Sequence, residues 1–375
     1  MKKKLLNNKI NGTLFVAFIL CFIGALTAQR YINNFIIFIS SFLHFSEQKH
    51  LYQLYPEEYH DYFLYGPIFT ILIAPFKLIP ISISKVLWSV LNFSVYAFAI
   101  KKLLKRNVTY FYIWFILCFQ DIYLSGLSFE INNLMVAIII IAFIYIQRSK
   151  EIISGILVGI FSMIKIFPIA SLIFLSFNIN RKKYILGILV GILIAIIVPI
   201  LFTNYDYTLN SLKEWLEVLS HKDHINRQLN NMVDYSFPGI IRKTTSNPNL
   251  SSFYFLFFGC IIALVLFIKN YLRQNLKYEL LVFSILSILV FNSNSESPSF
   301  IISSTAVAIW WIFVVKEKNR WEYFLIILYF LFSVLPTIDF YPKYIRDEYL
   351  HGYSLRALPP TLIWFHLVFK AIFKK

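Results

Sequence analysis

Three acidic residues stand at the ends of apolar segments, and each could act as a base on a hydroxyl group. Asp61 lies in the stretch YHDYFLYGP, Glu130 begins the stretch EINN, and Glu296 lies in NSESP between two apolar runs. A positioned carboxylate that accepts a proton typically accelerates a reaction by about 10²–10⁴-fold. We rank Asp61 first, Glu296 second and Glu130 third as the candidate catalytic base. The alternative for each one, taken alone, is a solvated loop acid.

A lysine between two short apolar segments is the first candidate for binding an anion. Lys165 lies in the stretch MIKIFP, three positions before Pro168. An uncompensated lysine at the centre of a membrane helix costs roughly 2.5–3.5 kcal/mol. We therefore predict a break in the helix here, which lets Lys165 reach the outer surface or a wet cavity and bind a phosphate group. The alternative is a lysine that snorkels from a helix end.

Further candidates for substrate binding come from polar segments between the apolar runs. Arg346 and Arg356 lie in DFYPKYIRDEYLHGYSLRALPP and could help to bind a phosphate, and Arg227 and Arg242 are weaker options. The candidates for binding a sugar or a hydroxylated acceptor are Tyr55, Glu57, Glu58, His60, Tyr65, Asn132 and Asn133. Interfacial anchoring would by itself explain the aromatic residues among them, because amphipathic rings settle at headgroup depth. No His, Asp or Glu spacing matches a metal motif, so we predict no metal and no cofactor.

The elements that must position these residues are membrane helices. The chain has 375 residues, of which 58% are hydrophobic and 14% charged, with a mean hydropathy of +0.67. Soluble domains are about 25% charged, and a membrane-spanning helix needs about 20 apolar residues. We predict an all-α polytopic membrane protein, folded as one domain over residues 1–375, with about twelve transmembrane helices. These spans lie near 12–28, 85–104, 107–127, 131–147, 151–164, 166–178, 183–202, 251–268, 279–292, 299–315, 321–337 and 359–373.

Charge patterning orients the predicted spans. Lys and Arg cluster in KKLLKR, QRSK, NRKK and KEKNR, and cytoplasmic loops carry such an excess. We therefore predict cytoplasmic termini and outer loops at 29–84, 203–250 and 338–358, where most acidic residues also fall. The segment 67–83, which contains three prolines, is predicted to be a juxtamembrane or re-entrant piece rather than a crossing. The first apolar segment is interpreted as a retained helix rather than a cleaved signal peptide.

The remaining composition excludes two classes. The net charge of +16 arises from these short clusters, and no basic face or motif supports binding to nucleic acid. The three cysteines all fall inside apolar runs, where they are expected to pack as small side chains. We predict no disulfide. The bilayer itself is the expected partner, and the bacterial cytoplasmic membrane is the expected location.

Four stretches carry a resemblance to a known family. They are residues 33–80, LWSVLN at 87–92, SGLSFEINNLMVAI with GILVGIFSMIKIFPI at 125–169, and FNSNSESPSFIISSTAVAIWW at 291–311. Together they resemble the GT-C class of multi-spanning glycosyltransferases, and within it the GT87 (DUF2029) family of mannosyltransferase-like enzymes. The resemblance implies a GT-C-like helix bundle and juxtamembrane helices in the first outer loop. It also implies transfer of a mannose-like hexose from a polyprenyl-phosphate donor to a lipid or glycan acceptor at the outer face.

One position departs from the family pattern. The resemblance implies an acidic catalytic residue just after the first span, whereas in this sequence that position is Asn33 or Asn34. An asparagine cannot take a proton from a hydroxyl, so the base comes from elsewhere or the chemistry is altered. A transporter or lipid flippase, an O-antigen-type polymerase and an inactive member remain alternatives. Transporters usually carry inverted repeats, and we find none in the sequence.

Overall fold

The computed structural model describes residues 2–28, 32–229, 233–317, 319–337 and 340–374. Within these ranges the chain is helical and contains no strand. The α-helices are α1 (Lys2–Thr27), α2 (Ile32–Ser46), α3 (Ile68–Lys77), α4 (Ile81–Leu104), α5 (Val108–Ser128), α6 (Asn132–Ile146), α7 (Glu151–Ser162), α8 (Arg181–Phe202), α9 (Tyr205–Asn226), α10 (Phe237–Thr245), α11 (Ser252–Arg273), α12 (Lys277–Phe291), α13 (Phe300–Ile309), α14 (Arg320–Tyr329) and α15 (Leu358–Phe373). The 3-10 helices are η1 (Phe167–Ser176), η2 (Ser297–Ser299), η5 (Leu335–Thr337) and η7 (Leu355–Ala357), and the π-helices are η3 (Trp310–Val314), η4 (Phe330–Val334) and η6 (Ile345–His351).

The prediction of an all-helical, multi-pass membrane protein is confirmed. Six described helical segments are long and apolar enough to cross a membrane: Leu6–Thr27, Ile81–Leu104, Val108–Ser128, Arg181–Phe202, Ser252–Arg273 and Ser297–Val314. Each of them coincides closely with one of the predicted spans. The remaining predicted spans fall on shorter helices, so the total of about twelve crossings and the orientation of the loops stay predictions.

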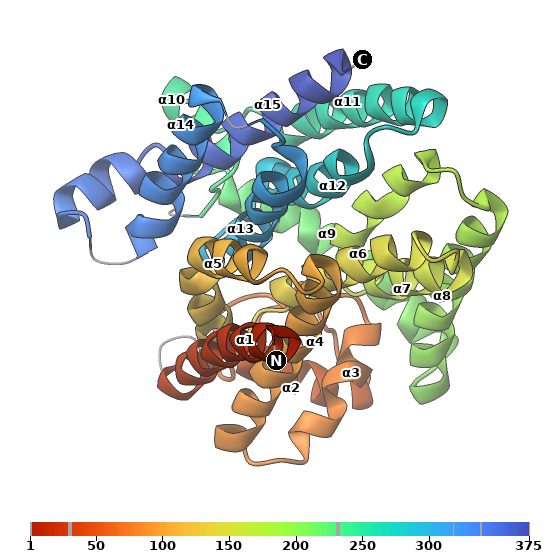
Figure 1. Ribbon diagram of the computed structural model, residues 1–375. Coiled ribbons are helices and arrows are strands. Elements are labelled where there is room, and N and C mark those ends of the chain that lie inside the picture. The colour runs from red at the N-terminus through yellow and green to blue at the C-terminus, as the bar shows by residue number, and fades with distance from the viewer. Residues whose placement is uncertain (1, 29–31, 230–232, 318, 338–339, 375) are drawn as a thin grey trace.

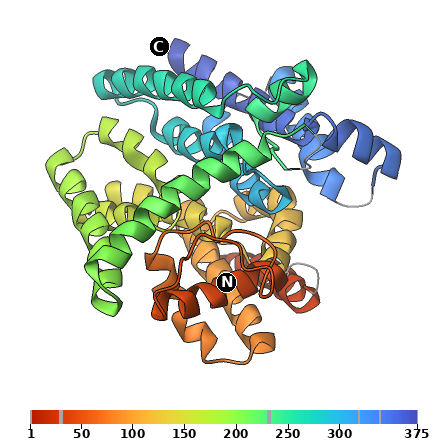
Figure 2. The ribbon, with the colours of Figure 1, turned by 180° about the vertical axis from the view of Figure 1, so that it is seen from behind.

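The N-terminal helices and most of the C-terminal helices lie at opposite ends of the molecule. In both views of the ribbon, α1 to α4 form one end, while α10, α11, α14 and α15 form the other (Figures 1 and 2). The helices α5, α6, α12 and α13 lie between these ends, where α5 packs on α1 and α13, and α6 packs on α4. Helix α6 is buried along nearly its whole length, which explains why its sequence is apolar on every side.

Small residues set the tightest helix pair, α7 with α8. Gly155 and Gly159 of α7 face Gly187 and Gly191 of α8, each pair in G-x-x-x-G spacing. A Cβ atom on Gly155 would lie 2.3 Å from the carbonyl oxygen of Tyr184, so a larger residue would push the helices apart. Backbones approach this closely in membranes because helix association depends on van der Waals packing rather than on expulsion of water.

The predicted break between two short spans is confirmed, with one correction. Helix α7 ends at Ser162, and the next helix begins at Phe167, so Lys165 lies in the gap between them. The second segment, predicted as a membrane helix at 166–178, is instead the 3-10 helix η1. Pro168 lies in its first turn, where the missing N–H would have had no partner within the helix.

The segment 203–250 is mostly helical. Helix α9 has 22 residues and a polar sequence, and it runs across one face of the molecule (Figure 2). Asn204 starts it, because its side-chain oxygen accepts from the backbone N–H of Tyr207 at 2.8 Å. Trp215 anchors the middle of α9 by donating from its indole N–H to the carbonyl oxygen of Leu64 at 3.0 Å. Helix α9 is thus held against the loop that follows α2.

Candidate functional site

A cavity of about 780 Å³ lies among α9, η1, α11, α12 and the loops that join the other helices. Its lining combines a set of charged and polar side chains, termed the polar end, with a set of apolar ones, termed the apolar end. The polar end comprises Asn34, Asp61, Tyr62, Tyr65, Glu130, Lys165, Lys222, Asp223, Arg227, Ser293, Asn294 and Glu296. The structure therefore gathers all three predicted carboxylates and the predicted lysine around one space.

Lys165 reaches the cavity because another segment docks on the break that carries it. Gly66 donates its N–H to the carbonyl oxygen of Ile164 at 3.0 Å, and a Cβ atom on Gly66 would lie 1.9 Å from the carbonyl oxygen of Met163. Only glycine fits this approach. The Lys165 ammonium lies 4.6 Å from the ring centre of Phe167 and 5.4 Å from that of Tyr65, so aromatic faces stabilise its charge.

The Lys165 ammonium contacts no carboxylate directly. It donates to Oδ1 of Asn132 at 2.8 Å, and among the described residues no acidic oxygen lies within ion-pair distance of it. Burial lowers the pKa of Lys165, while Glu130 and Glu296 oppose this shift through their charges. A cation in this state gains most from an anion that enters the cavity.

Glu130 is fixed by the turn that ends α5. Phe129 adopts a left-handed conformation with φ of 61°, and Trp88 donates to its carbonyl oxygen at 2.9 Å. The Glu130 carboxylate accepts from the side-chain amide of Asn132, which also accepts from Lys165 and so bridges the two charges. Burial raises the pKa of Glu130, and the positive charge of Lys165 opposes that shift.

Glu296 is the least satisfied of the three carboxylates. It precedes the short helix η2 and faces the polar end of the cavity. Within the described part of the chain its carboxylate accepts no hydrogen bond and lies in no ion pair. Burial, reinforced by the charge of Glu130, raises the pKa of Glu296 to about 7. A general base is most effective when its pKa lies near the pH at which the enzyme works.

Asp61 forms an ion pair with Lys222 of α9, and both side chains line the cavity. The Lys222 ammonium donates to both carboxylate oxygens, at 2.7 and 2.9 Å, and the backbone N–H of Tyr62 donates to one of them at 2.7 Å. The Lys222 side chain is 15% exposed, and that of Asp61 is 40% exposed. The first-ranked carboxylate is therefore accessible but already neutralised by a cation.

Helix α9 supplies charged residues that our sequence reasoning missed or ranked low. Lys222, Asp223 and Arg227 all line the cavity, and Arg227 pairs with Asp223 at 3.0 Å. Asn226 of the same helix donates to Asn294 at 2.9 Å, which ties α9 to the loop before η2. The signal was present in the sequence, since Trp215, Leu219 and Lys222 have the spacing of one helix face.

Several predicted site residues lie away from the cavity. Arg356 is buried in an ion pair with Asp121 at 3.1 Å, and Arg346 lies in η6, where it pairs with Asp347 at 3.2 Å. Asn133 lies in the first turn of α6, where its side-chain oxygen accepts from the backbone N–H of Leu134 at 2.9 Å. The cavity lining includes none of these residues and none of Tyr55, Glu57, Glu58 and His60.

The last four residues lie in the loop after α2. The ring of Tyr55 stacks on that of His44 at 3.9 Å, and His44 lies 3.1 Å from the carboxylate of Glu58. Glu57 and His60 are exposed. Asn34 does line the cavity, and its amide donates to the carbonyl oxygen of Ser128 at 3.2 Å. The acidic position that the resemblance expects is thus filled by an amide bonded to backbone.

The apolar end of the cavity is built from three segments of the chain. Helix α11 contributes Phe253, Leu256, Gly259, Cys260 and Ala263, α12 contributes Phe283, Ile288 and Phe291, and η1 with the residue before it contributes Ile166, Ile169, Ala170 and Ile173. Residues 253–263 cover about 15 Å of helix at a rise of about 1.5 Å per residue. Only 11% of the α11 span is buried, whereas the span 297–314 is 72% buried. The apolar end therefore lies beside a helix that faces lipid.

This arrangement can take a proton at a carboxylate, hold an anion at a lysine and accommodate a long apolar chain. Among the described residues, no group of three His, Cys, Asp or Glu side chains could hold a metal ion. A model of glycosyltransferase family 87 matches residues 63–304.

The chain belongs to glycosyltransferase family 87.

Membership of this family makes the protein a membrane glycosyltransferase and supports the enzyme hypothesis over the transporter hypothesis. The matched range contains Glu130, Lys165, Lys222 and Glu296, whereas Asn34 and Asp61 precede it. No curated protein and no solved structure matches the chain.

Proposed function

We propose that this family 87 member transfers a mannose-like hexose from a polyprenyl-phosphate carrier to a lipid or glycan acceptor. The proposed location is the outer face of the bacterial cytoplasmic membrane, with the reaction of the GT-C class. The observation that carries the proposal is that one cavity joins Lys165 and the three candidate carboxylates to an apolar groove on a lipid-facing helix. A lipid-linked sugar needs polar side chains for its phosphate and sugar and apolar side chains for its polyprenyl chain.

The reaction assigns a role to each end of the cavity. The acceptor oxygen bonds to the anomeric carbon as the bond from that carbon to the phosphate oxygen breaks. The acceptor proton passes to a carboxylate, with Asp61 as first candidate and Glu296 as second. The electron pair stays on the departing phosphate, where Lys165 stabilises the growing charge. The polyprenyl chain lies along Leu256, Gly259 and Ala263 of α11.

The pairing of the cavity cations favours a monophosphate donor. Lys165 is the cavity cation without a carboxylate partner among the described residues, while Lys222 and Arg227 are paired with Asp61 and Asp223. A polyprenyl-phosphate sugar carries one negative charge, which one such lysine offsets. No divalent cation is needed for that balance.

A transfer assay in proteoliposomes tests the proposal. Wild-type protein receives polyprenyl-phosphate mannose or glucose with candidate lipid and glycan acceptors, and sugar transfer is followed by radiolabel. We expect Asp61→Asn or Glu296→Gln to lower turnover by about 10²–10⁴-fold. Glu217→Gln, a change in an exposed pair of α9 with Lys213, is the matched control and should leave turnover unchanged. Transfer that occurs from nucleotide sugars and from no lipid-linked donor would contradict the proposal.

A further inference from the structure

The ion pair of Asp61 with Lys222 presents a difficulty for any mechanism in which Asp61 is the base. Both carboxylate oxygens already accept hydrogen bonds from the ammonium, and one of them also accepts from the N–H of Tyr62. If Asp61 took the acceptor proton, it would lose its charge and Lys222 would lose its counter-ion. Lys222 would then be a desolvated cation, because its side chain is only 15% exposed.

The reaction creates the replacement counter-ion at the same moment. The donor is a phosphodiester with one negative charge, and the departing polyprenyl phosphate gains a second one as the sugar leaves. Lys165 offsets the first charge. Lys222 lines the same cavity as Lys165 and lies on a flexible four-carbon stem. It can therefore turn from the carboxylate to the phosphate.

We propose that Lys222 passes from Asp61 to the departing phosphate as Asp61 takes the acceptor proton. The proton of the acceptor hydroxyl passes to Asp61, and the acceptor oxygen bonds to the anomeric carbon. The bond from the anomeric carbon to the phosphate oxygen breaks. The charges of Asp61, Lys222 and phosphate sum to minus one before the step and to minus one after it. Lys222 thus stabilises the transition state more strongly than it stabilises the bound donor. This movement of Lys222 from Asp61 to the phosphate, termed the handover, rests on the proposed function.

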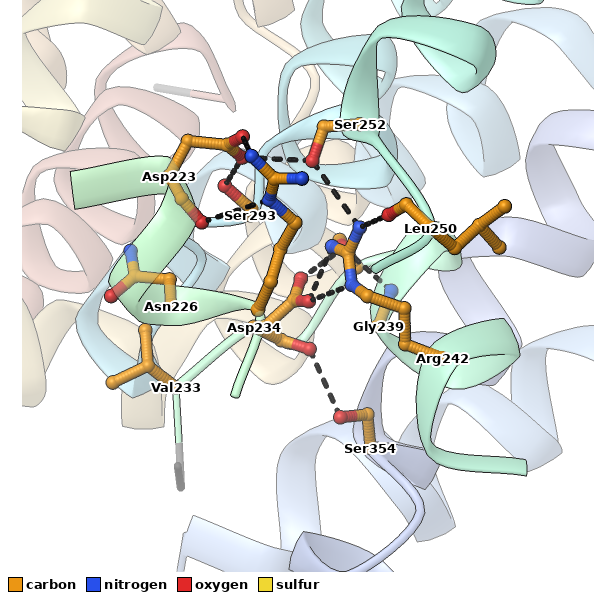
Figure 3. A network of polar contacts seen from close by, with 12 residues as sticks. Asp223, Asn226, Val233, Asp234, Gly239, Arg242, Leu250, Ser252, Ser293 and Ser354 are labelled. Atoms are coloured by element: carbon orange, nitrogen blue, oxygen red, sulfur yellow. Dashed lines mark hydrogen bonds and ion pairs between the residues drawn. The ribbon is translucent and has the colours of Figure 1, made fainter. Parts of the chain in front are cut away.

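The neighbouring groups do not offer the same exchange. Arg227 is paired with Asp223, whose carboxylate also accepts from Ser252 at 2.8 Å and from Ser293 at 2.5 Å, so that pair is held within a network (Figure 3). Glu296 contacts no cation among the described residues, so its protonation would release none. Asp61 with Lys222 is the pair that can separate inside the cavity.

A purely structural ion pair is the competing explanation. Such a pair would link the loop after α2 to α9 and would serve the same purpose as the bond from Trp215 to Leu64. Removing either partner would then loosen the site and weaken ligand binding. The handover predicts the opposite for one variant, because Asp61→Asn frees Lys222 while leaving it in place.

The test is equilibrium binding of a polyprenyl monophosphate to purified, detergent-solubilised protein. Asp61→Asn should bind this lipid about tenfold more tightly than wild type, which is the size of one charge-assisted hydrogen bond. In the double variant Asp61→Asn with Lys222→Gln the affinity should return to the wild-type level. Glu217→Gln, the surface change on the same helix, should leave affinity unchanged. Tightening that persisted in the double variant would reflect lost repulsion alone and would overturn the handover.

Kinetics provide a second, independent measurement. Lys222→Gln should lower kcat at least tenfold with little change in the donor KM, because the lysine meets the phosphate only as the bond breaks. Equal kcat in wild type and Lys222→Gln would overturn the handover and leave the proposed function standing. Failure of wild type to bind the lipid phosphate would instead overturn the proposed function itself.

Discussion

Two groups of buried charges lie close together in this protein, and they differ in how completely they are paired. In the network around Arg242, the guanidinium donates to Asp234 at 2.6 and 3.1 Å, to the carbonyl oxygen of Leu250 and to Ser252 (Figure 3). Asp234 also accepts from Ser236 at its carboxylate and from Ser354 at its carbonyl oxygen. Every charge in this network has a fixed partner.

The cavity is the opposite case. Lys165 has an amide oxygen and two aromatic rings but no carboxylate partner, and the Glu296 carboxylate has no donor within the described chain. A fully paired buried network specifies one structure, whereas an incompletely paired one leaves its groups available to a ligand. The completeness of pairing therefore distinguishes charged residues that stabilise the fold from charged residues that remain available to bind a substrate.

The largest expected effect belongs to the fully paired network. Arg242→Gln leaves Asp234 as a buried charge without its partner, and breaking such a pair typically costs about 3–5 kcal/mol. We expect a marked fall in the thermal midpoint and in yield of folded protein, measured in detergent by fluorescence. Adding Asp234→Asn should restore part of the loss. Lys165→Gln, made in the cavity, should change the midpoint far less, and equal losses from both would remove the distinction.

The next effect concerns the donor. Lys165→Gln removes the cation that faces the phosphate, and a hydrogen bond to a charged group is worth about 1.5–3 kcal/mol, or roughly 10–100-fold in affinity. We expect the donor KM to rise by that factor in the transfer assay. Arg346→Gln, a change in η6 away from the cavity, is the matched control. A larger rise in KM for Arg346→Gln would move the phosphate site out of the cavity.

A smaller effect tests the apolar groove. Ala263 lines the cavity on α11, while the adjacent Leu264 is 59% exposed and is not among the residues that line it. Ala263→Trp should displace part of the polyprenyl chain, and the loss of two buried methylene groups at about 0.8 kcal/mol each weakens binding about tenfold. Leu264→Trp should have no such effect on lipid affinity. Equal affinities in the two variants would show that the chain binds elsewhere.

The last expected effect is a pH dependence of stability. The pKa of Glu296 is raised in the folded protein to about 7 from an ordinary value of 4.5. Its contribution to stability is therefore complete below pH 4.5 and is lost as the pH rises through about 7. We expect the thermal midpoint of wild type to fall more between pH 5 and pH 8 than that of Glu296→Gln. Glu217→Gln should keep the wild-type slope, and a parallel slope in Glu296→Gln would contradict the assignment.

The sequence predicted the helices more fully than the site. Long apolar runs specify membrane helices through their length alone, and the predicted span 107–127 became α5 at 108–128. The break at Lys165 followed from the cost of placing a charge inside a helix. The 3-10 geometry of η1 was missed, since hydropathy does not distinguish helix types.

The site residues depended on contacts that the sequence does not display. Asp61 and Lys222 are 161 positions apart and meet only because α9 packs on the loop after α2. The segment containing α9 was predicted as a loop, because its overall polarity outweighed the helical spacing of its apolar residues. Arg356 was a reasonable candidate by charge, yet its partner Asp121 lies 235 positions away in α5. Whether a cation is paired is a property of the folded chain.

We expect Lys165 and the α11 groove to bind one lipid-phosphate molecule between them. A cryo-electron microscopy structure of the protein with a polyprenyl monophosphate would show this directly. We expect phosphate density within hydrogen-bond distance of Lys165 Nζ and chain density along Leu256, Gly259 and Ala263. Phosphate density beside Arg346 with the cavity empty would contradict it.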